Sequence, residues 1–426
     1  MVQTPETTTR TASGISGYLG RLAAVWRQGD FRWYWLASSI QGLGQSTQFM
    51  VIGWLVLEIT GSSAQLGLVI FLYGAPNVSF LLVAGVVADR FDRRHIMMLT
   101  QAVVGGIIVA LAVLTIAGVV TVWHIYAAAV AMGVFQSLSM PARMTIIGDL
   151  VDQPSVLDGV AMQNMAVHAG RMIGPPVAGV IIEVWSVGVS LAFISVCYVL
   201  SVLLVGRIGP ISRPVVPAAQ SVFRNFADGV VYIKNNPIVL TVIVTTCAFG
   251  GFGMSHMQVV PAMAKDVLGA GAGEIGLLFL GSAIGSLAGS MILPAISRAH
   301  VYRALLLSLL IFTVVLTLFA WSDWFWTTFL FFGLVGAVGV GMVWPLATTV
   351  VQIETTAEVR GRVMGMLQFT PGFHFLGAYP LALAAGQLGW EVAITGAGVL
   401  SLVTTIWFAF VRRGAPKLGR QEAAAV

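Results

Sequence analysis

Twelve stretches of mostly apolar residues, each long enough to cross a lipid bilayer, dominate this sequence of 426 residues. A spanning helix needs about 20 such residues because each one advances the helix by about 1.5 Å. Only 9% of the residues are charged, whereas a soluble domain usually has about 25%. The sequence therefore predicts an all-α membrane protein of twelve transmembrane helices, at approximately 33–57, 65–88, 96–119, 123–142, 159–183, 187–206, 237–260, 274–297, 301–320, 326–352, 363–386 and 391–411.

The basic residues gather on one side of the predicted membrane. If the N-terminus is cytoplasmic, 20 of the 22 Lys and Arg residues lie inside, Lys265 lies outside and Arg171 lies within the membrane. This asymmetry follows the positive-inside rule and predicts a bacterial-type inner membrane with both termini in the cytoplasm. The formal net charge of +5 thus reflects topology, and we expect no nucleic-acid partner.

The two halves of the chain resemble each other in sequence. Leu66-Gly67-Leu68 matches Ile275-Gly276-Leu277, and Gly174 matches Gly377. These matches predict two six-helix bundles, 33–206 and 237–411, related by pseudo-two-fold symmetry, with a linker at 207–236 and cytoplasmic tails at 1–32 and 412–426. Parallel repeats of this kind enclose a substrate site near the middle of the membrane. Apolar and charged residues alternate in the linker, which favours an amphipathic helix on the inner membrane surface over an ordinary solvated linker.

A loop motif follows the second predicted helix, with its glycine, acid and three arginines at Gly85, Asp89, Arg90, Arg93 and Arg94. It is similar to the loop signature G-x-L-x-D-R-x-G-R-R of the major facilitator superfamily, although Val87 and Asp92 depart from it. A positive-inside loop with a tight turn is the alternative. The resemblance implies a cytoplasmic latch, in which Asp89 faces the N-terminus of helix 11 and pairs with Arg360 or Arg362 in the outward-facing state.

A second motif lies in helix 5, at Gly170, Gly174, Pro175 and Gly179. It resembles the G-x-x-x-G-P-x-x-G-G signature of exporters in the same superfamily, with Ala178 at the penultimate glycine. The resemblance implies export by antiport, and a structural kink is the alternative, because Gly and Pro are common in membrane helices.

The resemblance extends over nearly the whole chain. Pro141-Ala-Arg143 and Glu358-Val-Arg360-Gly361-Arg362 are similar to the branch that contains the enterobactin exporter and the macrolide efflux pumps. One departure is that helix 4 has no charged residue before Arg143, where many proton-coupled drug antiporters have an arginine.

Arg171 is the main candidate for substrate contact, because an arginine within the membrane is costly unless it faces a polar space or a partner. Its plausible neighbours are uncharged, and a structural role among them is the alternative: Gln163 and Asn164 on the same helix, and Gln41, Gln45 and Gln48 on helix 1. The internal repeat maps Arg171 onto His374, which predicts that both lie beside one central cavity. His168, His256 and His374 are further candidates, and His374 or His168 could carry a coupling proton.

These residues favour a neutral or anionic amphiphile over a lipophilic cation, because no acidic residue lies deep in the membrane. We expect a proton-coupled exporter of drugs or siderophores that works by alternating access as a monomer. A lipid or lysolipid flippase and a non-transporting sensor or scaffold are the alternatives. The sequence contains no zinc-protease, serine-hydrolase or nucleotide-binding motif, and Cys197 and Cys247 have no metal-binding spacing, so we expect neither an enzyme nor a cofactor or metal.

Overall fold

The computed structural model describes residues 15–210 and 222–411, and within these ranges the regular secondary structure is entirely helical. The first half contains six long helices: α2 (Phe31–Thr60), α3 (Ser63–Arg90), α4 (Arg93–Ile116), α5 (Val122–Leu150), α6 (Val156–Val184) and α7 (Val187–Val205). A shorter helix, α1 (Ile15–Trp26), precedes them within the predicted N-terminal tail. The predicted C-terminal tail lies outside the described residues.

The second half also crosses six times, but three of its crossings are interrupted. The seventh consists of α9 (Pro237–Ala248), a π-helical turn at Phe249–Gly253 and α10 (His256–Leu268). The tenth consists of α13 (Phe325–Val335), π-helical residues at Gly336–Val343 and α14 (Trp344–Glu354). The eleventh consists of α15 (Ala357–Leu367), a 3-10 turn at Thr370–Gly372 and α16 (Phe373–Leu388). The continuous crossings are α11 (Ala272–Ser290), α12 (Val301–Ala320) and α17 (Trp390–Val411).

Ten helical segments of the described chain are long and apolar enough to cross a membrane by length and composition alone. The other two crossings are α2, which contains three glutamines, and the interrupted α15–α16 segment. Both pack extensively inside the bundle, α2 against α6 and α7, and α16 against α3. Polar residues are tolerated there because neighbouring helices, rather than lipid, surround much of each helix.

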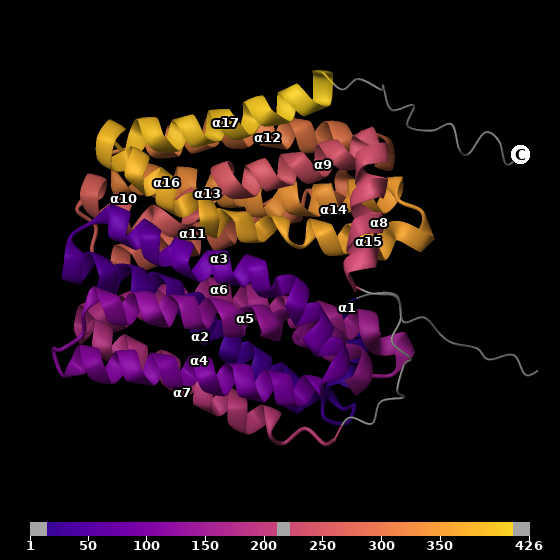
Figure 1. The fold of residues 1–426 in the computed structure, drawn as a ribbon, viewed down its shortest axis with the longest axis horizontal. Coiled ribbons are helices and arrows are strands. Elements are labelled where there is room, and N and C mark those ends of the chain that lie inside the picture. The colour runs from indigo at the N-terminus through magenta and orange to yellow at the C-terminus, as the bar shows by residue number, and fades with distance from the viewer. Residues whose placement is uncertain (1–14, 211–221, 412–426) are drawn as a thin grey trace, which may run out of the picture.

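The helices form two bundles that lie side by side. Figure 1 shows the first half, in indigo and purple, below the second half, in pink to yellow, with the long helices roughly parallel. The helix α8 (Val222–Asn235) lies across one end of the second bundle rather than along it (Figure 1). We call the end that carries α8 the inner end and the opposite end the outer end.

Local sequence determines where several helices begin and end. Gly61 adopts a left-handed conformation (φ 60°) that ends α2, and the side chain of Ser62 then accepts a hydrogen bond from the backbone N–H of Gln65 at the start of α3. The side chain of Asn236 accepts hydrogen bonds from the first N–H groups of α9, which begins with Pro237. These residues allow short connections between long helices.

The glycines of the internal repeat lie where the two halves meet. A Cβ atom added to Gly67 of α3 would lie 3.0 Å from the Cα of Tyr379 in α16. A Cβ atom added to Gly276 of α11 would lie 2.9 Å from the Cα of Pro176 in α6. Both approaches are too close for any side chain, so glycine lets the helices touch at these two symmetry-related positions. The repeat seen in the sequence therefore corresponds to the main contact between the halves.

Candidate functional site

An aromatic cluster closes the space between the halves in its outer part. Phe375 of α16 packs against Phe49 of α2 and Tyr73 of α3, with ring centroids 5.4 and 5.0 Å away, and Phe49 and Tyr73 pack edge to face at 5.0 Å. Phe375 also lies directly against Gly74, where any side chain would displace it. Phe375 therefore contacts three residues of the opposite half.

A second set of contacts joins the halves at the outer rim. Asp266, near the end of α10, accepts a hydrogen bond from the Ser63 hydroxyl at 2.9 Å and another from the Trp390 indole at 3.0 Å. The ammonium group of the adjacent Lys265 lies 5.2 Å from the centroid of Trp54 in α2. The contacts named so far all lie between the middle of the bundle and its outer end, so this conformation is closed on the outer side.

Arg171 lies midway along α6, one turn to the inner side of the point where Pro175 contacts α11. Its side chain is exposed, as are those of Asn164 and His168, which precede it by seven and three residues on the same helix face. Arg171 makes no hydrogen bond or ion pair with the described residues. It is nevertheless close enough to His168, and to His374 of the opposite half, for electrostatic interaction with both. Arg171 is therefore an exposed cation that lies near residues of both halves.

His374 occupies the position in the second half that matches Arg171 in the first. It lies two residues after the 3-10 turn that interrupts the eleventh crossing, and its Nδ1 atom contacts the carbonyl oxygen of Pro371. Its ring stacks on Phe375 at 4.0 Å. His374, which lies near Arg171, thus directly precedes and contacts Phe375, the aromatic residue that closes the outer side.

Three of the candidate glutamines belong to buried networks of the first half. Gln41 accepts a hydrogen bond from Gln101, which in turn accepts one from Ser201. Gln48 accepts hydrogen bonds from Gln136 and from Tyr198, and Gln45 donates one to Gln136. Gln41 and Gln48 are 2% and 0% exposed, so in this conformation they hold helices together and do not line the space near Arg171, whereas Gln45 is only partly buried.

The centre of the larger network is Gln136, which the sequence analysis did not single out. Its carbonyl oxygen accepts hydrogen bonds from Gln45 at 2.9 Å and from the Tyr73 hydroxyl at 2.7 Å. Its amide group donates to Gln48 and to Tyr198. Tyr73 therefore connects this network to the aromatic cluster.

His256 lies in the core of the second half and is 1% exposed. Its Nδ1 atom lies 2.6 Å from the carbonyl oxygen of Gly253, while its Nε2 atom is buried without a hydrogen-bond partner. The rings of Phe312, Phe319 and Phe332 surround it at about 6 Å. The structure therefore does not bring His256 together with Arg171, because it packs inside its own bundle.

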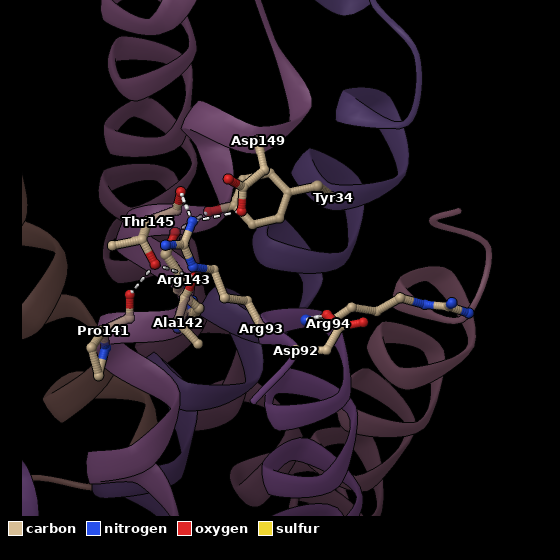
Figure 2. A network of polar contacts seen from close by, with 9 residues as sticks. All are labelled: Tyr34, Asp92, Arg93, Arg94, Pro141, Ala142, Arg143, Thr145 and Asp149. Atoms are coloured by element: carbon tan, nitrogen blue, oxygen red, sulfur yellow. Dashed lines mark hydrogen bonds and ion pairs between the residues drawn. The ribbon is translucent and has the colours of Figure 1, made fainter. Parts of the chain in front are cut away.

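Two arginines of the loop motif, Arg93 and Arg94, join helices within the first half. Figure 2 shows Arg93 and Arg94 pointing in different directions from the start of α4. Arg93 donates hydrogen bonds to the carbonyl oxygen of Thr145 and to the carboxylate of Asp149, at 2.9 and 2.6 Å. Arg94 donates to the carbonyl oxygens of Val205 and Gly206. The motif thus fastens α4 to α5 and to the end of α7.

The predicted partners of the latch have other contacts in this conformation. Arg362 pairs with Asp228 of α8 at 3.4 Å, and Arg360 donates a hydrogen bond to the carbonyl oxygen of Thr355. Gly85 is only partly buried, and the side chains of Asp89 and Arg90 lie outside the described part of the structure. The contact between Asp89 and the eleventh crossing therefore stays a prediction.

The glycines of the helix 5 motif lie on two faces of α6. Gly170 and Gly174 face α2, where a Cβ atom on Gly170 would lie 2.9 Å from the carbonyl carbon of Gly42. Gly179 faces the second half and touches Ala272 of α11. Pro175 lies within the helix between these two contacts. The motif therefore supports packing within the first half and the outer contact between the halves.

Two bundles of six membrane-crossing helices around an accessible central arginine define a multi-pass membrane transporter of the major facilitator type. The chain matches the model of the family described as "Transmembrane secretion effector" over residues 21–423 and belongs to that family. Its relatives are transporters, so the protein is not an enzyme.

Curated relatives include siderophore and drug transporters. The "Staphyloferrin A transporter" of Staphylococcus aureus is 23% identical over 90% of this chain and 96% of its own. The "Multidrug efflux pump Tap" of Mycolicibacterium fortuitum is 25% identical over 83% of this chain and 85% of its own. The "Enterobactin exporter EntS" of Shigella flexneri is also 25% identical, but over only 54% of this chain and 55% of its own.

Solved structures with the same fold include the nucleoside transporter NupG, with a TM-score of 0.72 at 15% identity, covering 90% of this chain and 100% of that one. A bacterial homologue of the lysosomal transporter Spinster, solved in an inward-facing conformation, has a TM-score of 0.64 at 12% identity over 91% of this chain and 95% of its own. At these identities the similarity establishes the fold.

Proposed function

We propose that this protein is a secondary transporter that exports a neutral or anionic amphiphilic molecule of the drug or siderophore type. The observation that carries the proposal is the position of Arg171, which is exposed, lies midway along α6 and makes no hydrogen bond or ion pair with the described residues. Asn164 and His168 are exposed on the same face of α6, and His374 of the opposite half is close enough to Arg171 for electrostatic interaction. A guanidinium group in such a position recognises carboxylates and similar anions through charge-assisted hydrogen bonds.

The proposed orientation places the inner end in the cytoplasm. Arg93, Arg94, Arg298, Arg360 and Arg362 all lie at that end, whereas Lys265 lies at the outer end. Basic residues are retained on the cytoplasmic side of bacterial membranes. In this orientation the conformation described above is inward-facing, ready to accept a substrate from the cytoplasm of a bacterial-type inner membrane.

Transport would proceed by alternating access of the two halves. Closure of the inner end would require the outer contacts of Phe375, Asp266 and Lys265 to separate, and would bring Asp89 towards the eleventh crossing to close the latch. The family resemblance implies exchange for protons, for which His168 and His374 are the available side chains. One chain supplies both halves, so a monomer suffices.

Flux in proteoliposomes tests the proposal. A catecholate siderophore, a macrolide, a lysolipid and a cationic dye are compared, with and without a pH gradient, in wild type and Arg171→Ala. We expect an anionic or neutral compound to move and its flux to be lost in the variant. Movement of the lysolipid alone would favour a flippase, and ready movement of the cationic dye with no effect of Arg171→Ala would contradict the proposal.

A further inference from the structure

The charge of Arg171 has no counterpart in the membrane-spanning part of the chain. Every Asp and Glu on the membrane-crossing helices lies in the first or last turn of its helix, as Glu58, Asp158 and Glu183 illustrate on α2 and α6. Asp158, the acid nearest to the inner end of α6, pairs with Arg21 of α1. His168 and His374, the titratable groups near Arg171, do not neutralise it, because they are neutral or positive. In this conformation Arg171 is exposed, which leaves its guanidinium group open to solvation by water.

Closure of the inner end would remove that water. The face of α11 that already contacts α6 includes Ala272 and Gly276. Continued at helical spacing towards the inner end, this face presents Leu280, Ala283 and Leu287, which are all apolar. When α6 and α11 meet along their inner halves, Arg171 would therefore be enclosed beside apolar residues. An unpaired charge in such surroundings is strongly disfavoured.

We infer that the occluded state forms only when an anion is bound to Arg171, so that transport is an obligatory exchange of anions. This inference rests on the proposed function, specifies its substrate as anionic, and replaces the protons that the family resemblance implies with a second anion as the exchanged ion. The organic anion neutralises Arg171 while the site turns from the cytoplasm to the outside. After its release, a second anion must bind from outside before the empty site can return. The penalty for an arginine at the centre of a membrane helix corresponds to about 100-fold slower return of the unloaded protein.

Exchange is tested with proteoliposomes that contain the self-quenching aromatic carboxylate dye carboxyfluorescein as its potassium salt, with valinomycin present so that potassium ions can leave with the dye and charge separation does not limit dye release without phthalate. The outside is a zwitterionic buffer with sucrose, with or without the aromatic dicarboxylate phthalate. For the wild type we expect dye release at least tenfold faster with phthalate outside. Arg171→Lys should keep this ratio, Arg171→Gln should reduce it to about one, and Arg298→Gln, which removes an exposed charge at the inner end, should behave as wild type.

Occlusion is tested separately, without a transported compound. Leu157 and Met291 are exposed at the inner ends of α6 and α11 and can be replaced by cysteine and labelled for distance measurement by energy transfer, after Cys197 and Cys247 are replaced by serine. In the zwitterionic buffer the wild type should remain open at the inner end, and phthalate or Arg171→Gln should allow closure.

Equal release rates with and without phthalate, or equal closed populations of wild type and Arg171→Gln without anions, would overturn the inference. Closure without dye movement in any condition would instead contradict the proposed function.

Discussion

Phe375 of the second half packs edge to face against Tyr73 of the first half, with ring centroids 5.0 Å apart. The two residues come from α16 and α3, which also touch at Gly67. His374 precedes Phe375 in the chain and Tyr73 bonds to Gln136, so the aromatic contact lies between the site near Arg171 and the buried network of the first half. Any conformational change that opens the outer side must separate this pair.

Phe375→Ala should therefore favour the conformation that is open to the outside. The variant loses two aromatic contacts across the halves, each worth about 0.5–1.5 kcal/mol beyond burial, which predicts a shift of about tenfold or more in the equilibrium. Energy transfer between labels at 157 and 291 would show a larger population closed at the inner end. Trp407→Ala, on the exposed face of α17, is the matched control and should leave that population unchanged.

The outer rim should contribute less. Lys265→Met removes the cation–π contact with Trp54, worth about 0.5–1 kcal/mol at an exposed site, so the same measurement should show a shift of about two- to fivefold. The effect should add to that of Phe375→Ala, because the two contacts share no partner. Lys234→Met, an exposed lysine of α8, serves as the control. A shift as large as that of Phe375→Ala would mean that the rim, rather than the aromatic cluster, holds the outer side closed.

Gly170 and Gly42 face each other across α6 and α2, but only one of them has room for a methyl group. A Cβ atom on Gly170 would lie 2.9 Å from the carbonyl carbon of Gly42, whereas one on Gly42 would meet nothing within 4 Å. Gly170→Ala should lower the apparent melting temperature in detergent, at a cost of about 1–3 kcal/mol, while Gly42→Ala should not. If both variants melted alike, the close contact between α6 and α2 described here would be wrong.

Gln136 should stabilise the first half through its four hydrogen bonds. Gln136→Leu leaves Tyr73, Gln45 and Gln48 without this partner, and a buried polar group without a partner costs about 1–3 kcal/mol. The melting temperature should fall clearly. Gln163→Leu is the matched control, because the carbonyl oxygen of Gln163 is already buried without a partner and its loss should cost little. Equal melting temperatures for the two variants would contradict a structural role for the network.

The sequence was sufficient to predict the fold, because twelve apolar stretches and one-sided basic residues leave few alternatives. The internal repeat also located real contacts, since Gly67 and Gly276 lie where the halves touch. The repeat also predicted that Arg171 and His374 lie beside one central cavity, because the symmetry of the two halves relates their positions. By contrast, periodicity could not separate Gln41 and Gln48, which are buried, from Gln45, which is partly accessible, because all three lie on one polar stretch of α2.

The residues that the sequence analysis missed are those defined by three-dimensional contact alone. Phe375, Phe49 and Tyr73 are ordinary apolar residues of membrane helices, and nothing in their spacing indicates that they meet across the two halves. Gln136 lies five residues before the Pro141-Ala-Arg143 motif, but a single glutamine in an apolar stretch does not indicate which helices it joins. The surroundings of His256 could not be predicted either, because a histidine in a membrane helix suggests a functional site and here it packs among phenylalanines.

The central claim is that Arg171 binds the anionic group of the substrate between the two halves, and equilibrium binding tests it most directly. Fluorescence anisotropy of carboxyfluorescein can be titrated with purified wild type, Arg171→Lys and Arg171→Gln. Loss of a charge-assisted hydrogen bond, worth about 1.5–3 kcal/mol, predicts a Kd raised by about 10- to 100-fold in Arg171→Gln and by less in Arg171→Lys. The same Kd for all three proteins would contradict the claim.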